Sequence, residues 1–167
     1  PPMTSMKYAR EFDEVKTIGD STAQTNAQQT MGRFWSGNFV AQWNEATRRI
    51  AIANVNNIGD SARLFALANV AGADAAMAVW DAKYFYNFWR PSMAIHDAAL
   101  DGNRRTEPQA GWTTYFGSLP VTPANPVNPA YPDYVSGANG LTGAFTGLLR
   151  EYFETDDIQF SVRSVPF

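Results

Sequence analysis

The sequence predicts an all-α fold, a helical bundle whose helices share one core. Several long stretches repeat apolar residues at spacings of three and four, the period of a helix that buries one face. No stretch alternates apolar and polar residues over enough positions to form a sheet. The chain has 167 residues, 45% of them hydrophobic. It can therefore form a single helical domain over residues 1–167, or the N-terminal or central portion of one.

Helices fill most of the first hundred residues. Residues 1–24 are polar and form a peripheral segment with one short helix, at residues 8–17. The core helices occupy residues 25–100. We expect them at residues 25–35, 39–57, 61–89 and 92–100.

Capping residues set the borders of the longest predicted helix. Gly59 is expected to end the preceding helix in a left-handed conformation, and Asp60 and Ser61 to cap the next one. The long helix is nearly apolar all round, which predicts that it is buried within the bundle. Pro91 must end or kink it, because a proline pushes the preceding residue out of the helical region.

A long proline-rich loop, residues 101–135, leads into the last helix. Its prolines fall at every third position from 120 to 132, the period of polyproline II, which predicts a stiff extended strut. The helix at residues 136–153 carries the candidate site, and Gly143 and Gly147 on it allow another helix to approach closely. Residues 154–167 form an extended tail. Both chain ends are abrupt, so we expect the bundle to be incomplete in this chain.

Composition excludes several classes of function. Charged residues make up 17% of the chain and the net charge is −3, so the basic stripe typical of nucleic-acid binding is missing. No uninterrupted apolar run approaches the roughly 18 residues that span a bilayer. The chain has no cysteine, which excludes disulfides and thiolate chemistry and leaves the cellular compartment unassigned.

Two cations lie at helical spacing on the longest predicted helix. Lys83 and Arg90 are seven residues apart, and Trp80 falls on the same stripe of an otherwise apolar surface. A buried cation needs an anion, either a carboxylate such as Asp74 or Asp81 or a bound oxyanion. The plain alternative is a pair of cations that reach solvent near a helix C-terminus, where the helix dipole favours them.

A Ser-Gly turn opens the last predicted helix. Ser136 is a suitable N-cap residue, and Gly137 gives the backbone freedom at the turn. The unbonded N–H groups at a helix start form a seat for an anion. On this motif alone, a bare helix cap and an oxyanion site are both open.

Taken together, the two motifs resemble a known family. The pattern Lys83-x6-Arg90-Pro91, followed after a long loop by Tyr131-Pro132-x-Tyr134-x-Ser136-Gly137, is similar to that of the vanadium-dependent haloperoxidases. These enzymes belong to the superfamily of type 2 phosphatidic acid phosphatases. The segments SARLFALANVAGADAAMAVWDAKYFYNFWRP and DGNRRTEPQAGW extend the likeness to the bacterial branch of the family.

The resemblance implies a site for vanadate, with phosphate as a substitute of the same shape and charge. The implied oxyanion-binding residues are Lys83, Arg90, Ser136 and Gly137, and Trp80 and Tyr131 would flank the pocket for halide and peroxide. The implied reaction is the oxidation of halide by hydrogen peroxide, with vanadate as the cofactor. Two alternatives stay open: an acid-phosphatase-like phosphoesterase on the same scaffold, and a non-catalytic oxyanion-binding or structural relative.

Two departures from the family pattern leave enzymatic activity open. Ala138 occupies the position at which the family has its acid–base histidine, so no residue of this chain is a certain catalyst. The third family motif, which supplies an arginine and a metal-binding histidine, is not found, so we expect no metal ligand from this chain. His96 lies outside the family motifs and is expected to be an ordinary helix-surface or core histidine.

The expected partners are small molecules and further protein. The small molecules are an oxyanion, a halide and peroxide, and neither nucleic acid nor a membrane span is expected. An incomplete bundle exposes apolar surface, for instance beside Gly143 and Gly147. We expect a second copy of the chain, or the remainder of a longer protein, to cover it. The residues assign no compartment, and the resemblance is compatible with a periplasmic or secreted protein.

Overall fold

The computed structural model describes residues 1–20, 22–115 and 129–163 of the chain. Within these ranges every regular element is a helix, and the only pairing of strand type is an isolated bridge between Asp20 and Thr114. The all-α class predicted from the sequence is therefore confirmed.

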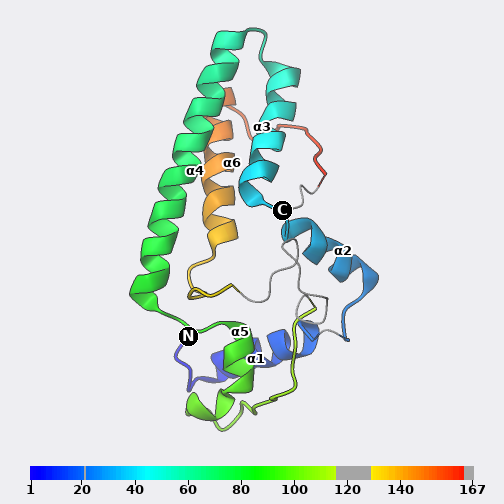
Figure 1. Cartoon of the computed structure of the whole chain (residues 1–167), viewed down its shortest axis with the longest axis vertical. Coiled ribbons are helices and arrows are strands. Elements are labelled where there is room, and N and C mark those ends of the chain that lie inside the picture. The colour runs from blue at the N-terminus through cyan, green and yellow to red at the C-terminus, as the bar shows by residue number, and fades with distance from the viewer. Residues whose placement is uncertain (21, 116–128, 164–167) are drawn as a thin grey trace. The chain divides into compact units, whose positions relative to one another are not determined.

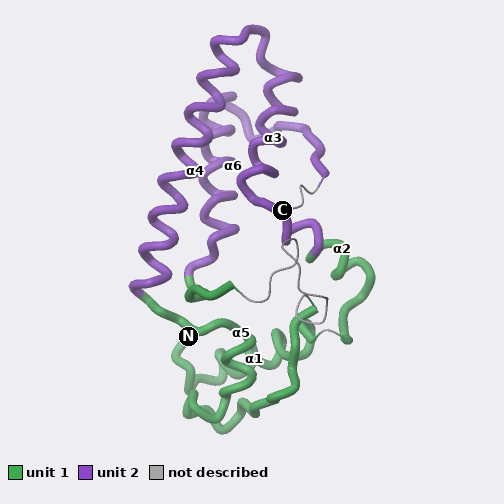
Figure 2. Tube along the Cα trace, viewed as in Figure 1, with its two compact units in different colours: residues 1–32, 86–134 green, residues 33–85, 135–167 purple. Residues whose placement is uncertain are grey.

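The first helices follow one another along the chain with short connections, and a long segment, residues 101–136, precedes the last helix (Figure 1). In order, they are α1 (Met6–Ile18), α2 (Asn26–Trp35), α3 (Phe39–Asn54), α4 (Ile58–Tyr86), α5 (Pro91–His96), the 3-10 turn η1 (Ala98–Leu100) and α6 (Gly137–Phe153). The chain divides into two compact units (Figure 2). Unit 1 contains residues 1–32 and 86–134, and unit 2 contains residues 33–85 and 135–167. The assignment of one domain to the whole chain stays a prediction.

Unit 1 is organised around the packing of α1 against α5. Tyr8 and Phe12 of α1 meet Ile95 of α5 and Trp112, and each of the four side chains is at most 8% exposed. The Trp112 indole N–H donates to the backbone carbonyl of Lys16 at 2.8 Å. This bond ties the segment after α5 to the last turn of α1.

Unit 2 holds the larger core, in which α3, α4 and α6 lie side by side (Figure 1). Phe145 of α6 stacks on Trp43 of α3, with ring centroids 5.5 Å apart and planes at 10°. Leu64 of α4 is completely buried in the same cluster. Burying side chains of this size stabilises the fold by about 1.5–3 kcal/mol each, so this cluster holds the three helices together.

The turn between α3 and α4 differs from the prediction. Helix α3 ends at Asn54, and Val55 is already extended, with φ −119° and ψ 123°. The Asn57 side-chain oxygen accepts a hydrogen bond from the Asp60 N–H at 2.8 Å, so Asn57 caps α4. Gly59 lies within the helix. The expected left-handed cap at Gly59 and N-caps at Asp60 and Ser61 are therefore wrong.

The far end of α4 also differs from the prediction. The helix stops at Tyr86, because Asn87 adopts a left-handed backbone with φ 44°. Asparagine tolerates this conformation better than most residues. Arg90 is extended, as the proline after it requires, and Pro91 is the first residue of α5. The stripe expected to carry both Lys83 and Arg90 on one helix is therefore wrong.

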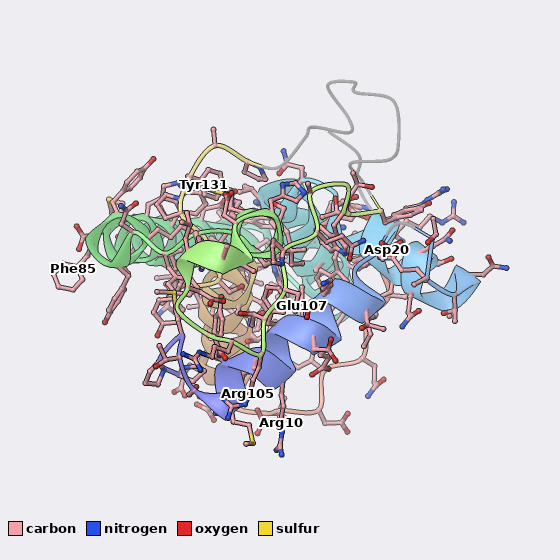
Figure 3. All side chains as sticks on the ribbon, turned by 90° about the horizontal axis from the view of Figure 1, so that it is seen from below. Arg10, Asp20, Phe85, Arg105, Glu107 and Tyr131 are labelled. Atoms are coloured by element: carbon pink, nitrogen blue, oxygen red, sulfur yellow. The ribbon has the colours of Figure 1, made fainter. Side chains whose placement is uncertain are left out.

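Helix α4 buries one narrow stripe rather than its whole circumference. The buried residues are Leu64, Ala68, Gly72, Val79 and Lys83. On its other sides, Val70, Met77 and Phe85 are at least 60% exposed, and Figure 3 shows the Phe85 ring standing away from the helix. The expectation of a helix buried on all sides is wrong, because α3 and α6 cover only one side of it among the described residues.

One stretch of the described chain, Ile58–His96, is long and apolar enough to cross a membrane by length and composition. Its most apolar 18-residue window has a mean hydropathy of 1.3, and 22% of that window is buried. A single stretch of this kind is weak support for a span, because the core helices of globular proteins pass the same test. Polar residues such as Asn69, Asp74 and Asp81 interrupt the stretch, so it contains no long uninterrupted apolar run.

The last helix was predicted closely. Helix α6 covers Gly137–Phe153, and Ser136 is its N-cap. The expected helix at residues 92–100 is present as two pieces, α5 and η1. Most of the expected proline strut lies at residues 116–128, outside the described residues.

The close packing of α4 on α6 can be tested with a pair of glycine substitutions. A methyl group at Gly72 would lie 2.8 Å from the buried Phe145 ring, whereas one at Gly143 would meet nothing within 4 Å. We expect Gly72→Ala to destabilise the protein by about 1–3 kcal/mol through overpacking. Gly143→Ala should stabilise it by up to about 1 kcal/mol through helix propensity. Urea unfolding measures both free energies, and equal stabilisation by the two variants would contradict the packing.

Candidate functional site

The N-terminus of α6 is a capped helix start that keeps free donors. The Ser136 hydroxyl oxygen accepts a hydrogen bond from the Asn139 N–H at 3.2 Å, and the Gly140 N–H donates to the Ser136 carbonyl at 3.1 Å. The first N–H groups of a helix have no acceptor within the helix. In α6 these are the N–H groups of Gly137 and Ala138, because the Asn139 and Gly140 N–H groups donate to Ser136. The hydroxyl proton of Ser136 is also available, because the hydroxyl uses only its oxygen in the cap.

A buried lysine lies against this helix start. Lys83, in the last turn of α4, is 3% exposed. Its Cε atom lies 3.8 Å from the point where a Cβ of Gly137 would stand, and Trp80 ring atoms lie 3.4–3.5 Å from the same point. The Lys83 ammonium also lies 6.0 Å from the centroid of the Trp80 ring. Unit 2 thus gathers a cation, an aromatic ring and the first residue of α6 in one place.

Arg90 is held within unit 1 by the segment that precedes α6. Its Nε donates to the Tyr131 carbonyl at 2.8 Å, and its guanidinium carbon lies 4.6 Å from the centroid of the Tyr131 ring. Its Nη1 is 3.4 Å from a carboxylate oxygen of Asp133. The Asp133 N–H in turn donates to the Phe88 carbonyl at 2.9 Å. Figure 3 labels Tyr131 on this segment.

The candidate residues therefore fall into two groups. Trp80, Lys83 and the Ser136–Gly137 turn belong to unit 2, and Arg90 and Tyr131 belong to unit 1. Asp133 was missed by the sequence analysis, which considered Asp74 and Asp81 as partners for the cations. Both of those aspartates are exposed, and the ion pair recorded for Arg90 goes to Asp133. The only local signal was the position of Asp133 within the same Tyr-Pro-x-Tyr motif.

Proton-handling and metal-binding groups are scarce around these residues. Ala138 follows Gly137 in the first turn of α6 and carries no titratable group. His96, the one histidine of the sequence, is exposed at the end of α5, and its Nε2 is 2.7 Å from the Trp112 carbonyl. It is a helix-surface histidine, one of the two ordinary positions that the sequence predicted. Within the described ranges, no three His, Asp or Glu side chains gather as a metal site.

The fold and these contacts define a class of protein: an all-α helical bundle with a buried cation beside a helix N-terminus. Residues 63–166 match the family described as the VCPO second helical-bundle domain, and the chain belongs to that family.

The vanadium chloroperoxidase of Curvularia inaequalis is a relative of this chain, 34% identical over 95 residues. The aligned part covers 47% of this chain and 15% of the relative, so the chain spans only a small part of that protein's length. No solved structure gives a significant match. The two matches support the vanadium haloperoxidase family indicated by the motifs. They assign neither the bacterial branch nor a role for any residue.

The capping role of Ser136 can be separated from the rest of the site. Ser136→Ala removes the side-chain oxygen that accepts from the Asn139 N–H, and we expect it to destabilise the protein by about 1 kcal/mol. Ser136→Asp keeps a capping oxygen and should retain the stability of the parent protein. Thermal unfolding of the two variants measures the effect. Equal losses in both would mean that the loss does not come from the capping oxygen.

Proposed function

We propose that this chain binds a tetrahedral oxyanion, vanadate or phosphate, at the N-terminus of α6, as part of a protein of the vanadium haloperoxidase type. The observation that carries the proposal is the buried Lys83 beside Gly137. A buried ammonium is stabilised by a nearby anion, and the N–H groups at a helix start favour one as well. The Lys83 ammonium and the N–H groups at the start of α6 therefore both favour a negative charge at this place.

The proposed roles follow from the donors that each residue offers. The N–H of Gly137 and the hydroxyl of Ser136 would bond to oxygens of the ligand, and Lys83 would neutralise part of its charge. Arg90 is proposed as a further donor, because its bonds to Tyr131 and Asp133 leave guanidinium N–H groups for a ligand. Trp80 and Tyr131 are proposed to border the place of halide and peroxide.

The described residues offer charge and hydrogen bonds to an oxyanion, and within them no three His, Asp or Glu side chains gather as a metal site. The one histidine, His96, bonds to the Trp112 carbonyl in unit 1. When bound in a complete site, vanadate would supply the oxidation of halide by hydrogen peroxide. The part proposed for this chain is to bind and orient the oxyanion and to polarise it through positive charge.

One observation favours a second function, that of a non-catalytic oxyanion-binding relative. Ala138 can neither accept nor donate a proton, although its position directly follows the proposed oxyanion donors. General acid–base catalysis contributes about 10²–10⁴-fold to a rate. The same gap weakens the phosphoesterase alternative, because hydrolysis of a phosphate ester also needs a proton for the leaving group.

Oxyanion binding is tested by the effect of orthovanadate or phosphate on thermal unfolding. We expect either anion at millimolar concentration to raise the Tm of the parent protein. Lys83→Met should reduce the shift, because it removes the charge and keeps most of the side-chain volume. Lys7→Met is the matched control, since Lys7 is a cation on the surface of α1, 75% exposed. Ser136→Asp should also reduce the shift, because it sets a negative charge at the seat.

Two results would contradict oxyanion binding at this site. One is a Tm that does not respond to millimolar vanadate or phosphate. The other is an equal loss of response in Lys83→Met and Lys7→Met, which would mean that the anions act through general surface charge.

The consequence of Ala138 is tested by restoring a titratable group. We expect Ala138→His to raise the rate of vanadate-dependent bromide oxidation, or of phosphate-ester hydrolysis, by about tenfold or more above the parent. Asn139→His moves the imidazole to the next residue of the same turn and should have a smaller effect. Equal rates in the parent and both variants would mean that the missing proton donor is not what limits activity.

A further inference from the structure

Unit 1 contains a cavity whose lining includes none of the residues proposed for the oxyanion. Its volume is about 460 Å³, within the range of about 300–1,000 Å³ typical of small-molecule sites. The walls come from α1, from residues 88–91 with α5, and from Asp133 and Tyr134. Three segments far apart in the sequence therefore build one concave surface.

Five of the twelve residues that line the cavity are aromatic. The aromatic lining residues are Tyr8, Phe12, Phe88, Trp89 and Tyr134. Tyr134 is 53% exposed and Phe88 is 39% exposed, so the aromatic surface continues to the outside of unit 1. The Tyr134 ring is held by an edge-to-face contact with Tyr86, at 5.1 Å between centroids. Rings arranged in this way favour a flat ligand that can stack on them or meet their edges.

The charged lining residues favour an uncharged ligand. Two carboxylates, those of Glu11 and Asp133, face the cavity, and each already has a cationic partner. Lys7 lies 3.8 Å from Glu11, and Arg90 lies 3.4 Å from Asp133. Each carboxylate is offset by its cation, so an anion gains no net attraction that would repay its desolvation. A cation would compete with the lysine and arginine already in place.

Two buried polar atoms of the lining residues favour a ligand that carries a hydrogen-bonding oxygen. The Tyr8 hydroxyl and the Trp89 indole nitrogen are shielded from solvent, and neither meets hydrogen-bond geometry with any described residue. Burial raises the pKa of the Tyr8 phenol, as does the Asp101 carboxylate, while the nearby Trp89 N–H opposes the rise. The Trp89 N–H lies toward the Tyr8 oxygen, so the Tyr8 O–H is the donor that most needs an acceptor. A buried donor without an acceptor costs about 1–3 kcal/mol. Both atoms are shielded, so a ligand oxygen reaches them only when the rings that carry them move.

We propose that this cavity binds an uncharged aromatic molecule of about two fused rings that carries a hydroxyl or carbonyl oxygen. The rings of the ligand stack on the aromatic lining, and its oxygen bonds to Tyr8 or Trp89. This binding does not depend on an oxyanion at Lys83.

The chemical class of the ligand is tested by three probes with one ring system. Isothermal titration calorimetry at neutral pH compares 2-naphthol, naphthalene and 2-naphthoate. We expect saturable one-to-one binding of 2-naphthol. Naphthalene should bind about 2- to 12-fold more weakly, the ratio that one net hydrogen bond of 0.5–1.5 kcal/mol gives. The carboxylate should bind at least about tenfold more weakly, because its desolvation is not offset by Glu11, Asp133 and their cations.

The place of binding is tested by a matched pair of substitutions on α1. Val15 lines the cavity and is 40% exposed, whereas Ile18 lies outside the lining and is 47% exposed. We expect Val15→Trp to abolish 2-naphthol binding by filling the cavity and Ile18→Trp to leave it unchanged. Trp89→Phe should lower the affinity for 2-naphthol to that for naphthalene if the indole is the donor, and Tyr8→Phe should do so if the phenol is. Lys83→Met should change nothing.

Three results would overturn the proposal. They are no saturable binding of 2-naphthol at its solubility limit, equal binding by Val15→Trp and Ile18→Trp, and tighter binding of the carboxylate than of the phenol. A loss of binding in Lys83→Met would move the site to the proposed oxyanion residues and would equally overturn it. Thermal unfolding of each variant confirms that a lost affinity does not come from a lost fold.

Discussion

The close approach of α6 to α4 is the constraint on which the arrangement of unit 2 depends. Two glycines allow it. A methyl group at Gly72 would meet the Phe145 ring, and one at Gly140 would overlap the Val79 side chain. Because neither position carries a side chain, α6 lies near enough to α4 for Gly137 to contact Trp80 and Lys83. A larger residue at either glycine would move the start of α6 away from the lysine, and the candidate site would be lost with the packing.

The break between α4 and α5 leaves Lys83 and Arg90 in different units. Asn87 turns the chain through a left-handed conformation, and Arg90 is extended before Pro91. Lys83 therefore belongs to the core of unit 2, whereas Arg90 takes its partners from the loop of unit 1. Asp133 pairs with the Arg90 guanidinium and also lines the aromatic cavity. A ligand in that cavity would lie beside Asp133, the ion-pair partner of Arg90, which is a proposed oxyanion donor.

Local signals in the sequence were sufficient for some of these features and not for others. The start of α6, at the candidate site, was predicted because the capping residue Ser136 and the glycine Gly137 are adjacent in the chain. The end of α4 was not, because only Pro91 was counted as a breaker, and asparagine reaches the left-handed region in some contexts only. Burial on one side of α4 depends on which helices pack against it, which periodicity cannot supply. The pair of Arg90 with Asp133 joins residues 43 positions apart, and no local pattern encodes that contact.

Lys83 lies between two helix ends, whose partial charges act on its ammonium in opposite directions. Lys83 lies in the last turn of α4, where the partial negative charge of the helix end favours it. It also lies beside the first residue of α6, whose partial positive charge disfavours it, and the first turn of α6 has no acidic residue to offset this. The effect of a helix end on a charge is about 0.3–1 kcal/mol at exposed sites and up to about 2 kcal/mol when partly buried. An anion at the start of α6 would interact favourably with both the helix and the lysine. When the oxyanion binds, its negative charge would offset the repulsion between the Lys83 ammonium and the start of α6.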